Sequence, residues 1–181
     1  MKKTISYILL MLGAVAFFAC NDGIDYEKMR KEELALLDEY MAVAHPGAER
    51  TPSGLYYFNE PETGAGDTIK TGDRVQIYYA TWTLDKTEEG VIDSFLIDET
   101  SGYLEGHRYE PYEVIPGTNG SIVGLEEALT YMQPGTRSRL VINSELAYGQ
   151  KGSGSYVGAF QTILMEVEVY KVIPFSVAEE E

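Results

Sequence analysis

Cysteine and histidine are scarce in this chain of 181 residues. Cys20 is the single cysteine, and His45 and His107 are the two histidines. One cysteine cannot build a disulfide framework, and three such side chains scattered along the chain do not make a recognisable metal site. The sequence also contains no Gly-x-Ser-x-Gly motif of the kind that carries a nucleophilic serine. We therefore expect neither a metal nor another cofactor.

Positive charge is scarce as well. The chain has 14 Lys and Arg against 29 Asp and Glu, for a net charge of −15. Nucleic-acid binding needs clustered basic residues that release counterions from phosphates, so we expect no nucleic-acid partner. The acidic balance favours a well-solvated, self-repelling surface, with an acidic recognition face as the alternative. The 14 tyrosines supply ample aromatic surface for a packed core, and disorder is not expected.

Long apolar runs are confined to the N-terminus. Lys2 and Lys3 precede an apolar segment at residues 5–18, which is the order found in secretory signal peptides. About 14 apolar residues are fewer than the roughly 20 that a membrane-spanning helix requires. We therefore expect residues 1–19 to be a signal peptide that is removed.

The residues around Cys20 resemble a bacterial lipobox. They read Phe17-Phe18-Ala19-Cys20, and in a lipobox the cysteine is lipidated and becomes the new N-terminus. The alternative is a plain secretory signal followed by an unpaired thiol. The position of the lone cysteine at this boundary favours a lipoprotein of the cell envelope, periplasmic or surface-exposed, attached to the membrane through Cys20.

Residues 20–50 are expected to form a tether followed by a helix. The helix is predicted over residues 24–44, and His45-Pro46-Gly47 ends it. Its short apolar stripe consists of Leu34, Leu37, Met41 and Ala44. Three roles are open for this helix: a spacer arm, a dimerisation helix, or a brace packed on the domain. The short stripe favours the arm or the brace, and the sequence leaves the oligomeric state open.

Residues 51–175 are expected to form one globular domain of the α+β class. Alternating apolar and polar residues predict strands at 55–59, 74–84, 109–115 and 161–173. Apolar residues three and four positions apart predict a short helix at 124–132, and a turn at Pro134-Gly135 leads into a further strand from Thr136. Strands, one helix and more strands indicate an antiparallel sheet curved over that helix. Residues 176–181 are expected to form an acidic tail.

Several motifs in this domain resemble those of FKBP-type peptidyl-prolyl cis-trans isomerases. Residues 122–127, IVGLEE, are similar to the family's V-I-x-G-hydrophobic-E-E helix. Residues 132–142 follow its M-x-x-G-x-(R/K)-x-(R/K)-L-x-I pattern, and residues 147–149 are its A-Y-G. The initial strands, S-G-L-x-Y at 53–57 and G-D-x-V-x-I-x-Y at 72–79, are also similar. The resemblance therefore covers nearly the whole domain.

The resemblance implies an FKBP-like curved antiparallel sheet wrapped over one short α-helix, here preceded by an N-terminal helix. It also implies isomerisation of X-Pro bonds, with proline-containing segments of exported proteins as substrates. Rotation about these bonds takes tens to hundreds of seconds without a catalyst. A dry apolar pocket accelerates it, because the planar amide separates charge and loses more solvation there than the twisted amide does.

The resemblance also assigns the site. Tyr148 would donate its hydroxyl to the carbonyl before proline, with Tyr79 and Asp93 as the other catalytic residues on the pocket rim. Ile122 would hold the peptide through its backbone amide, and Leu125 would form the floor. The full substrate-binding set is Ile92, Tyr112, Ile122, Leu125, Val157 and Met165.

Four positions depart from the family pattern. Ile92 stands where the family usually has Phe, and Leu125 where it often has Trp. Met165 stands where the family has an aromatic residue, and Ser121 where it has an apolar one. A less aromatic pocket predicts slow turnover or binding alone. The alternative function is therefore a non-catalytic FKBP-like module that recognises a partner protein or ligand through residues 94–108, a segment longer than the family's usual loop.

Overall fold

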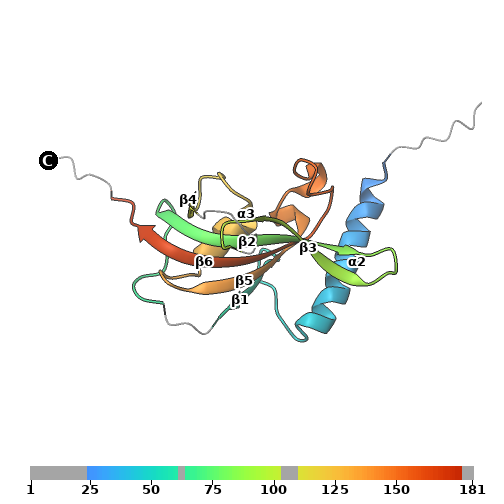
Figure 1. Ribbon diagram of the computed structural model, residues 1–181, viewed down its shortest axis with the longest axis horizontal. Helices are drawn as coiled ribbons and strands as arrows, with labels where there is room; N and C mark the ends of the chain where they lie inside the picture. The colour runs from blue at the N-terminus through green and yellow to red at the C-terminus, as the bar shows by residue number, and fades with distance from the viewer. Residues whose placement is uncertain (1–23, 61–63, 103–109, 177–181) are drawn as a thin grey trace, which may run out of the picture.

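The computed structural model describes residues 24–60, 64–102 and 110–176. In these ranges a sheet of six antiparallel strands bends around one short helix, and a longer helix lies at one end of the sheet (Figure 1). Strand order is β1-β5-β6-β2-β3, with β4 beside β2. The elements are α2 (Tyr26–Ala44), β1 (Tyr56–Asn59), β2 (Arg74–Lys86), β3 (Ile92–Glu99), β4 (Tyr112–Val114), α3 (Val123–Leu129), β5 (Arg137–Ile142), the 3-10 turns η1 (Ser144–Leu146) and η2 (Gly149–Lys151), and β6 (Ile163–Ile173).

The main core lies between the inner face of the sheet and α3. On β6 the inward residues Ile163, Met165, Val167 and Val169 are all buried, as their alternation predicts. Helix α3 contributes Leu125, Ala128 and Leu129 to the same core. The α+β class and the curved antiparallel sheet over one short helix, both expected from the sequence, are thus the observed architecture.

Gly124 allows α3 to sit directly on β5. A Cβ atom at this position would lie 2.5 Å from Cγ2 of Ile142, which is closer than two carbon atoms can approach. The glycine in the IVGLEE motif is therefore a packing requirement, because any side chain would push the helix away from the sheet.

Helix α2 packs on the other face of the sheet. Its side chains Leu37 and Met41 are buried against Tyr56 of β1 and Val141 of β5. Of the three roles considered for this helix, the brace is the one that these contacts support, although the outer members of the predicted stripe contribute little and Ala44 is exposed. No helix in the described ranges is both long and apolar enough to cross a membrane.

The prediction of a loop at residues 94–108 is wrong for residues 94–99, which belong to a strand. Residues 92–99 form β3, which pairs with an extended β2 from Ala80 opposite Glu99 to Lys86 opposite Ile92. The apolar run at 95–97 has high strand propensity, and its pairing with Trp82 and Thr83 completes the backbone hydrogen bonds of β2. Residues 103–109 lie outside the described residues, as do the predicted signal peptide, Cys20 and the last residues of the tail.

Candidate functional site

Three tyrosines and one carboxylate meet at the rim of the inner face. The Tyr79 hydroxyl on β2 donates a hydrogen bond to Oδ2 of Asp98 on β3 at 2.7 Å. The rings of Tyr79 and Tyr112 lie 5.7 Å apart at an angle of 76°, an edge-to-face arrangement. Tyr148, between η1 and η2, packs against the same core as Tyr79, and burial, with smaller contributions from Asp98 and Tyr112, raises the pKa of its phenol. These four residues form the tyrosine cluster.

Backbone contacts at the end of β3 place Asp98 in this cluster. The Tyr79 amide donates to Oγ1 of Thr100 at 3.0 Å, and the Thr100 amide donates to the Tyr79 carbonyl at 2.8 Å. Asp98 pairs in register with Thr81, two residues along β2. Residues separated by two positions share a face of the strand, so the Asp98 carboxylate can reach the Tyr79 phenol.

A short capped turn holds Tyr148. The Asn143 side chain accepts a hydrogen bond from the Leu146 amide at 3.3 Å and caps η1. Directly after Tyr148, Gly149 adopts a φ of 58°, a left-handed conformation that favours glycine. The Gly149 carbonyl then accepts from the Phe160 amide at 2.9 Å. The chain on both sides of Tyr148 is therefore fixed by hydrogen bonds.

Burial and neighbouring groups keep the phenols of Tyr79 and Tyr148 protonated. Burial raises the pKa of Tyr79, and its hydrogen bond to Asp98 raises that pKa further. Burial also raises the pKa of Tyr148, with smaller contributions from Asp98 and Tyr112. Among the described residues, the Tyr148 hydroxyl has no hydrogen-bond partner, whereas the Tyr79 hydroxyl is occupied by Asp98. Tyr148 is thus a neutral donor at physiological pH that can bind a ligand carbonyl.

The apolar residues predicted for the pocket lie together beside the cluster. Leu125, Val157 and Met165 are buried members of the main core. Ile122 precedes α3 as its N-cap residue and is partly buried against that core. Tyr112 is 41% exposed, as expected for a residue on the rim.

Asp93 and Ile92 are not part of this arrangement. Asp93 is exposed and pairs with Asp85, six residues beyond Tyr79 along β2, which is about 20 Å at 3.3 Å per residue. Asp98 holds the place that the sequence analysis gave to Asp93, and Ile97, which packs against the main core, holds that of Ile92. The signal in the sequence is ambiguous because Ile-Asp occurs twice within the residues of β3, five residues apart.

Sequence reasoning also missed the role of Glu126. This buried carboxylate accepts backbone hydrogen bonds from Gly117 at 2.8 Å, Asn119 at 3.2 Å and Ser121 at 3.0 Å. It thereby orders the loop that leads into Ile122. The Glu-Glu pair in the motif was the available signal, but its hydrogen-bond partners lie in a loop with no regular pattern.

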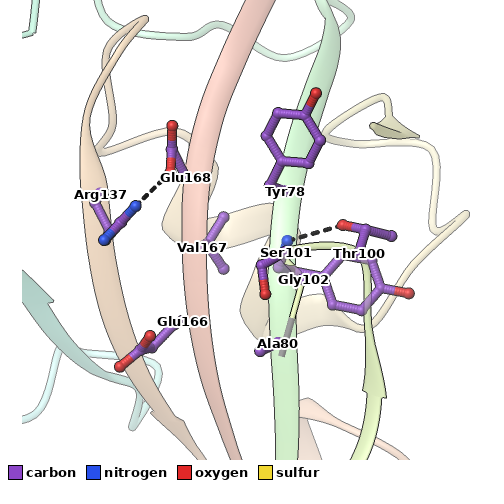
Figure 2. A pocket seen from close by; sticks show the side chains of 10 residues that line it. Tyr78, Ala80, Thr100, Ser101, Gly102, Arg137, Glu166, Val167 and Glu168 are labelled. Atoms are coloured by element: carbon purple, nitrogen blue, oxygen red, sulfur yellow. Dashed lines mark hydrogen bonds and ion pairs between the residues drawn. The ribbon is translucent and has the colours of Figure 1, made fainter. Parts of the chain in front are cut away.

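A hollow of about 470 Å³ lies on the outer face of the sheet (Figure 2). Its lining includes Tyr78, Ala80 and an ion pair between Arg137 and Glu168 at 2.6 Å. Tyr79 and Val167 also border the hollow, although both pack against the main core on the inner face. The other side chains of the hollow include the charged groups of Arg137, Glu166 and Glu168, so we place the candidate site on the inner face, where the tyrosine cluster meets apolar residues.

Comparisons with known proteins agree with the observed fold. Residues 66–170 match the family model described as FKBP-type peptidyl-prolyl cis-trans isomerase. The chain is 33% identical over 148 residues to the FKBP-type 22 kDa peptidyl-prolyl cis-trans isomerase of Escherichia coli K12, across 82% of this chain and 63% of that protein. It is 27% identical over 119 residues to an FK506-binding protein of Neisseria meningitidis serogroup A, across 66% of this chain and 97% of the relative.

Solved structures show the same similarity. The crystal structure of FkpA from Escherichia coli superposes with a TM-score of 0.62 at 30% identity, across 82% of this chain and 63% of that one. A peptidyl-prolyl cis-trans isomerase from Pseudomonas syringae gives a TM-score of 0.61 at 23% identity, across 83% and 97%, which supports the fold alone. The chain thus spans less than two thirds of the length of the two Escherichia coli proteins.

Proposed function

Because the chain belongs to the FKBP-type peptidyl-prolyl cis-trans isomerase family, we propose that it isomerises X-Pro bonds of exported proteins in the cell envelope. The observation that carries this proposal is the position of Tyr148. Its protonated hydroxyl lies at the rim of an apolar floor, beside a Tyr79 phenol already engaged by Asp98. A hydroxyl donor beside an apolar surface is a combination that accelerates rotation about an X-Pro bond.

The apolar part of the site receives the proline ring. Leu125, Val157 and Met165 line it from α3, the loop before β6 and β6 itself. The backbone amide of Ile122, at the start of α3, holds a carbonyl of the bound peptide. Glu126 supports this grip because it fixes the loop before Ile122. The site binds an extended peptide at the proline and at the residue before it.

Catalysis follows from the loss of charge separation in the twisted amide. The partial double bond gives a barrier of about 18–20 kcal/mol, and the polar planar amide is less well solvated in an apolar pocket than in water. The Tyr148 hydroxyl donates to the carbonyl before proline and fixes its orientation while the bond rotates. No proton is transferred, so the raised pKa of Tyr148 matters only because it keeps the donor in place.

Tyr79 and Asp98 shape the rim. Their hydrogen bond fixes the Tyr79 ring, which packs edge-on against Tyr112. Leu125 and Met165 are aliphatic where many family members have aromatic side chains, and Ile97 stands beside Asp98 at the position usually held by Phe. These replacements lower the aromatic surface available to proline, and slow turnover follows from them.

An isomerase assay on X-Pro peptides tests the proposal. A protease-coupled or NMR-exchange assay with micromolar protein should accelerate cis-to-trans conversion above the uncatalysed rate. A folded protein without acceleration would overturn the isomerase proposal and favour the non-catalytic binding module. Under that alternative, removal of residues 100–108, the part of the 94–108 segment that follows β3, should abolish partner binding while the sheet stays folded.

The envelope location rests on the N-terminal sequence. The basic pair, the apolar segment and Cys20 occur in the order of a lipoprotein signal. Metabolic labelling with a fatty-acid analogue should mark the wild-type protein, and Cys20→Ala should yield an unlabelled protein in the soluble fraction. Equal labelling of both proteins would show that Cys20 is not the attachment site.

A further inference from the structure

The Glu33 carboxylate of α2 is deeply buried and fully engaged. The residue is 5% exposed. Its oxygens accept hydrogen bonds from the Ser144 amide at 2.6 Å, the Ser144 hydroxyl at 2.7 Å and the Thr162 hydroxyl at 3.2 Å. Arg30 supplies the opposite charge at 2.7 Å. Buried carboxylates are costly unless they are paired and hydrogen-bonded, and this one meets both conditions.

The partners of Glu33 lie at the two ends of one segment. Residues 144–162 leave the sheet after β5 and return to it at β6, and they carry both Tyr148 and Val157. Ser144 opens this segment and Thr162 closes it. A single carboxylate from α2 therefore fastens both ends of the segment that contains the proposed hydroxyl donor.

Arg30 adds a second link between α2 and the 144–162 segment. Its guanidinium contacts Glu33 on one side and Glu145 of η1 on the other, at 2.7 Å in each case. Arg30 is largely buried, with 20% of its side chain exposed. Helix α2 thus contacts the first turn of the segment through two side chains that share one ion pair.

Helix α2 is also docked by a separate set of apolar contacts. The apolar contacts of Leu37 and Met41 with β1 and β5 already hold α2 on the sheet, whereas the hydrogen bonds of Glu33 go to the segment that bears Tyr148. Helix α2 also precedes the residues 66–170 that match the family model. The contact with Ser144 and Thr162 is therefore added to the matched region by the N-terminal helix.

We propose that Glu33 is a positioning residue that holds the 144–162 segment, and thereby Tyr148, in the geometry needed for isomerisation. This proposal rests on the proposed function for its catalytic part. When the Glu33 carboxylate is replaced, Ser144 and Thr162 lose the charged acceptor that they share, and the segment moves relative to Leu125 and Met165. The bound peptide is then less well oriented toward Tyr148, while the sheet stays folded.

Backbone hydrogen exchange in the full mature chain tests directly whether Glu33 holds the 144–162 segment in place. Glu33→Gln keeps the size of the side chain and removes its charge, and Glu32→Gln makes the same change on an exposed position of the same helix. Amides of Ser144, Ala147 and Phe160 should exchange faster in Glu33→Gln by about tenfold or more, since bonds to a charged acceptor are the strong ones. Amides of β5 and β6, and all amides of Glu32→Gln, should exchange as in the wild type.

Isomerase kinetics test the positioning. In Glu33→Gln, kcat/KM should fall by about tenfold or more, because a misplacement of 1 Å can cost roughly 100-fold. The loss should lie mainly in kcat, because Leu125 and Met165 of the proline floor lie outside the 144–162 segment. Glu32→Gln should keep wild-type kinetics. Loss of activity with uniformly faster exchange across the sheet would indicate general destabilisation and overturn the proposal.

Ser144→Ala provides a second, milder variant in case Glu33→Gln does not fold. It removes one donor to Glu33 and leaves the Ser144 amide in place, so a smaller effect in the same amides and in kcat is expected. Faster exchange of the segment with unaltered kcat would show that the fastening does not position Tyr148. An inactive wild type would refute the proposed function instead, and exchange in the segment would then decide whether Glu33 fastens it.

Discussion

The two faces of the sheet are built from alternate residues of the same strands, yet their surroundings differ. On β6 the inward side chain of Val167 is fully buried, whereas its neighbours Glu166 and Glu168 point outward. The inward face meets α3 through a continuous apolar core. The outward face is covered by α2 at one end and carries ion pairs elsewhere, including those of Arg137 and Arg139.

This difference explains why the candidate site lies where it does. The inner face supplies an apolar floor, and the tyrosine cluster supplies hydrogen-bond donors only at its rim. On the outer face, α2 covers the apolar cluster around Tyr56 and Val141, and Arg137 and Arg139 form ion pairs with Glu168 and Glu166 on the neighbouring strand. Substitutions should therefore have large effects on the inner face, selective effects at the rim and small effects on the ion pairs of the outer face.

The largest effect is expected from Leu129→Ala. Leu129 of α3 is fully buried in the main core, so truncation leaves a cavity between the helix and the sheet. Such substitutions cost about 2–5 kcal/mol of unfolding free energy. Urea denaturation should show a lower midpoint with an unchanged slope. A loss below 1 kcal/mol would mean that the inner face repacks easily and would weaken the contrast between the faces.

At the rim, Asp98→Ala should reduce activity while Asp93→Ala should not. The first substitution leaves the Tyr79 hydroxyl without its acceptor and frees the ring that packs on Tyr112. Bonds to charged acceptors are worth about 1.5–3 kcal/mol, so a fall in kcat/KM of roughly tenfold is expected. Asp93→Ala serves as the matched control on the same strand. The reverse pattern would place Asp93 in the site and show that the register of β3 is wrong.

The contrast between Asp93 and Asp98 shows where sequence reasoning reached its limit. Periodicity correctly predicted the core positions of β6 and the helix before β5, because burial on one face imposes a pattern within each element. It could not choose between two Ile-Asp pairs, because the choice depends on how far β2 continues and how β3 pairs with it. The same limit hid Glu33, whose partner Ser144 lies 111 residues away.

Tyr148→Phe should have a smaller effect than Asp98→Ala. The substitution keeps the ring that packs beside the core and removes only the donor. A net hydrogen bond is worth about 0.5–1.5 kcal/mol, so kcat/KM should fall roughly two- to tenfold. Thermal denaturation should give nearly the same Tm, because the hydroxyl has no partner among the described residues. Unaltered activity in a folded variant would make Tyr148 a packing residue.

A pH profile gives a still smaller effect. Burial and Asp98 raise the pKa of Tyr148 above the ordinary value, which is about 10 for tyrosine. A raised pKa means that the phenol keeps its proton up to a higher pH, so kcat/KM should stay level from about pH 6 to pH 9. Kinetics across this range would check it. A loss of activity centred below pH 9 that disappears in Tyr148→Phe would show that the pKa of the phenol is lowered and not raised.

The smallest effect is expected from Arg74→Gln on the outer face. Arg74 of β2 and Glu113 of β4 form an ion pair with a separation of 3.3 Å, and both side chains are about half exposed, at 56% and 43%. Exposed pairs contribute about 0–1 kcal/mol, and added salt screens them further. The unfolding free energy should therefore change by less than about 1 kcal/mol, with less change at 1 M salt and with isomerase activity retained. A loss comparable to that of Leu129→Ala would show that this ion pair, and not the inner core alone, holds β4 and its rim residue Tyr112 against the sheet.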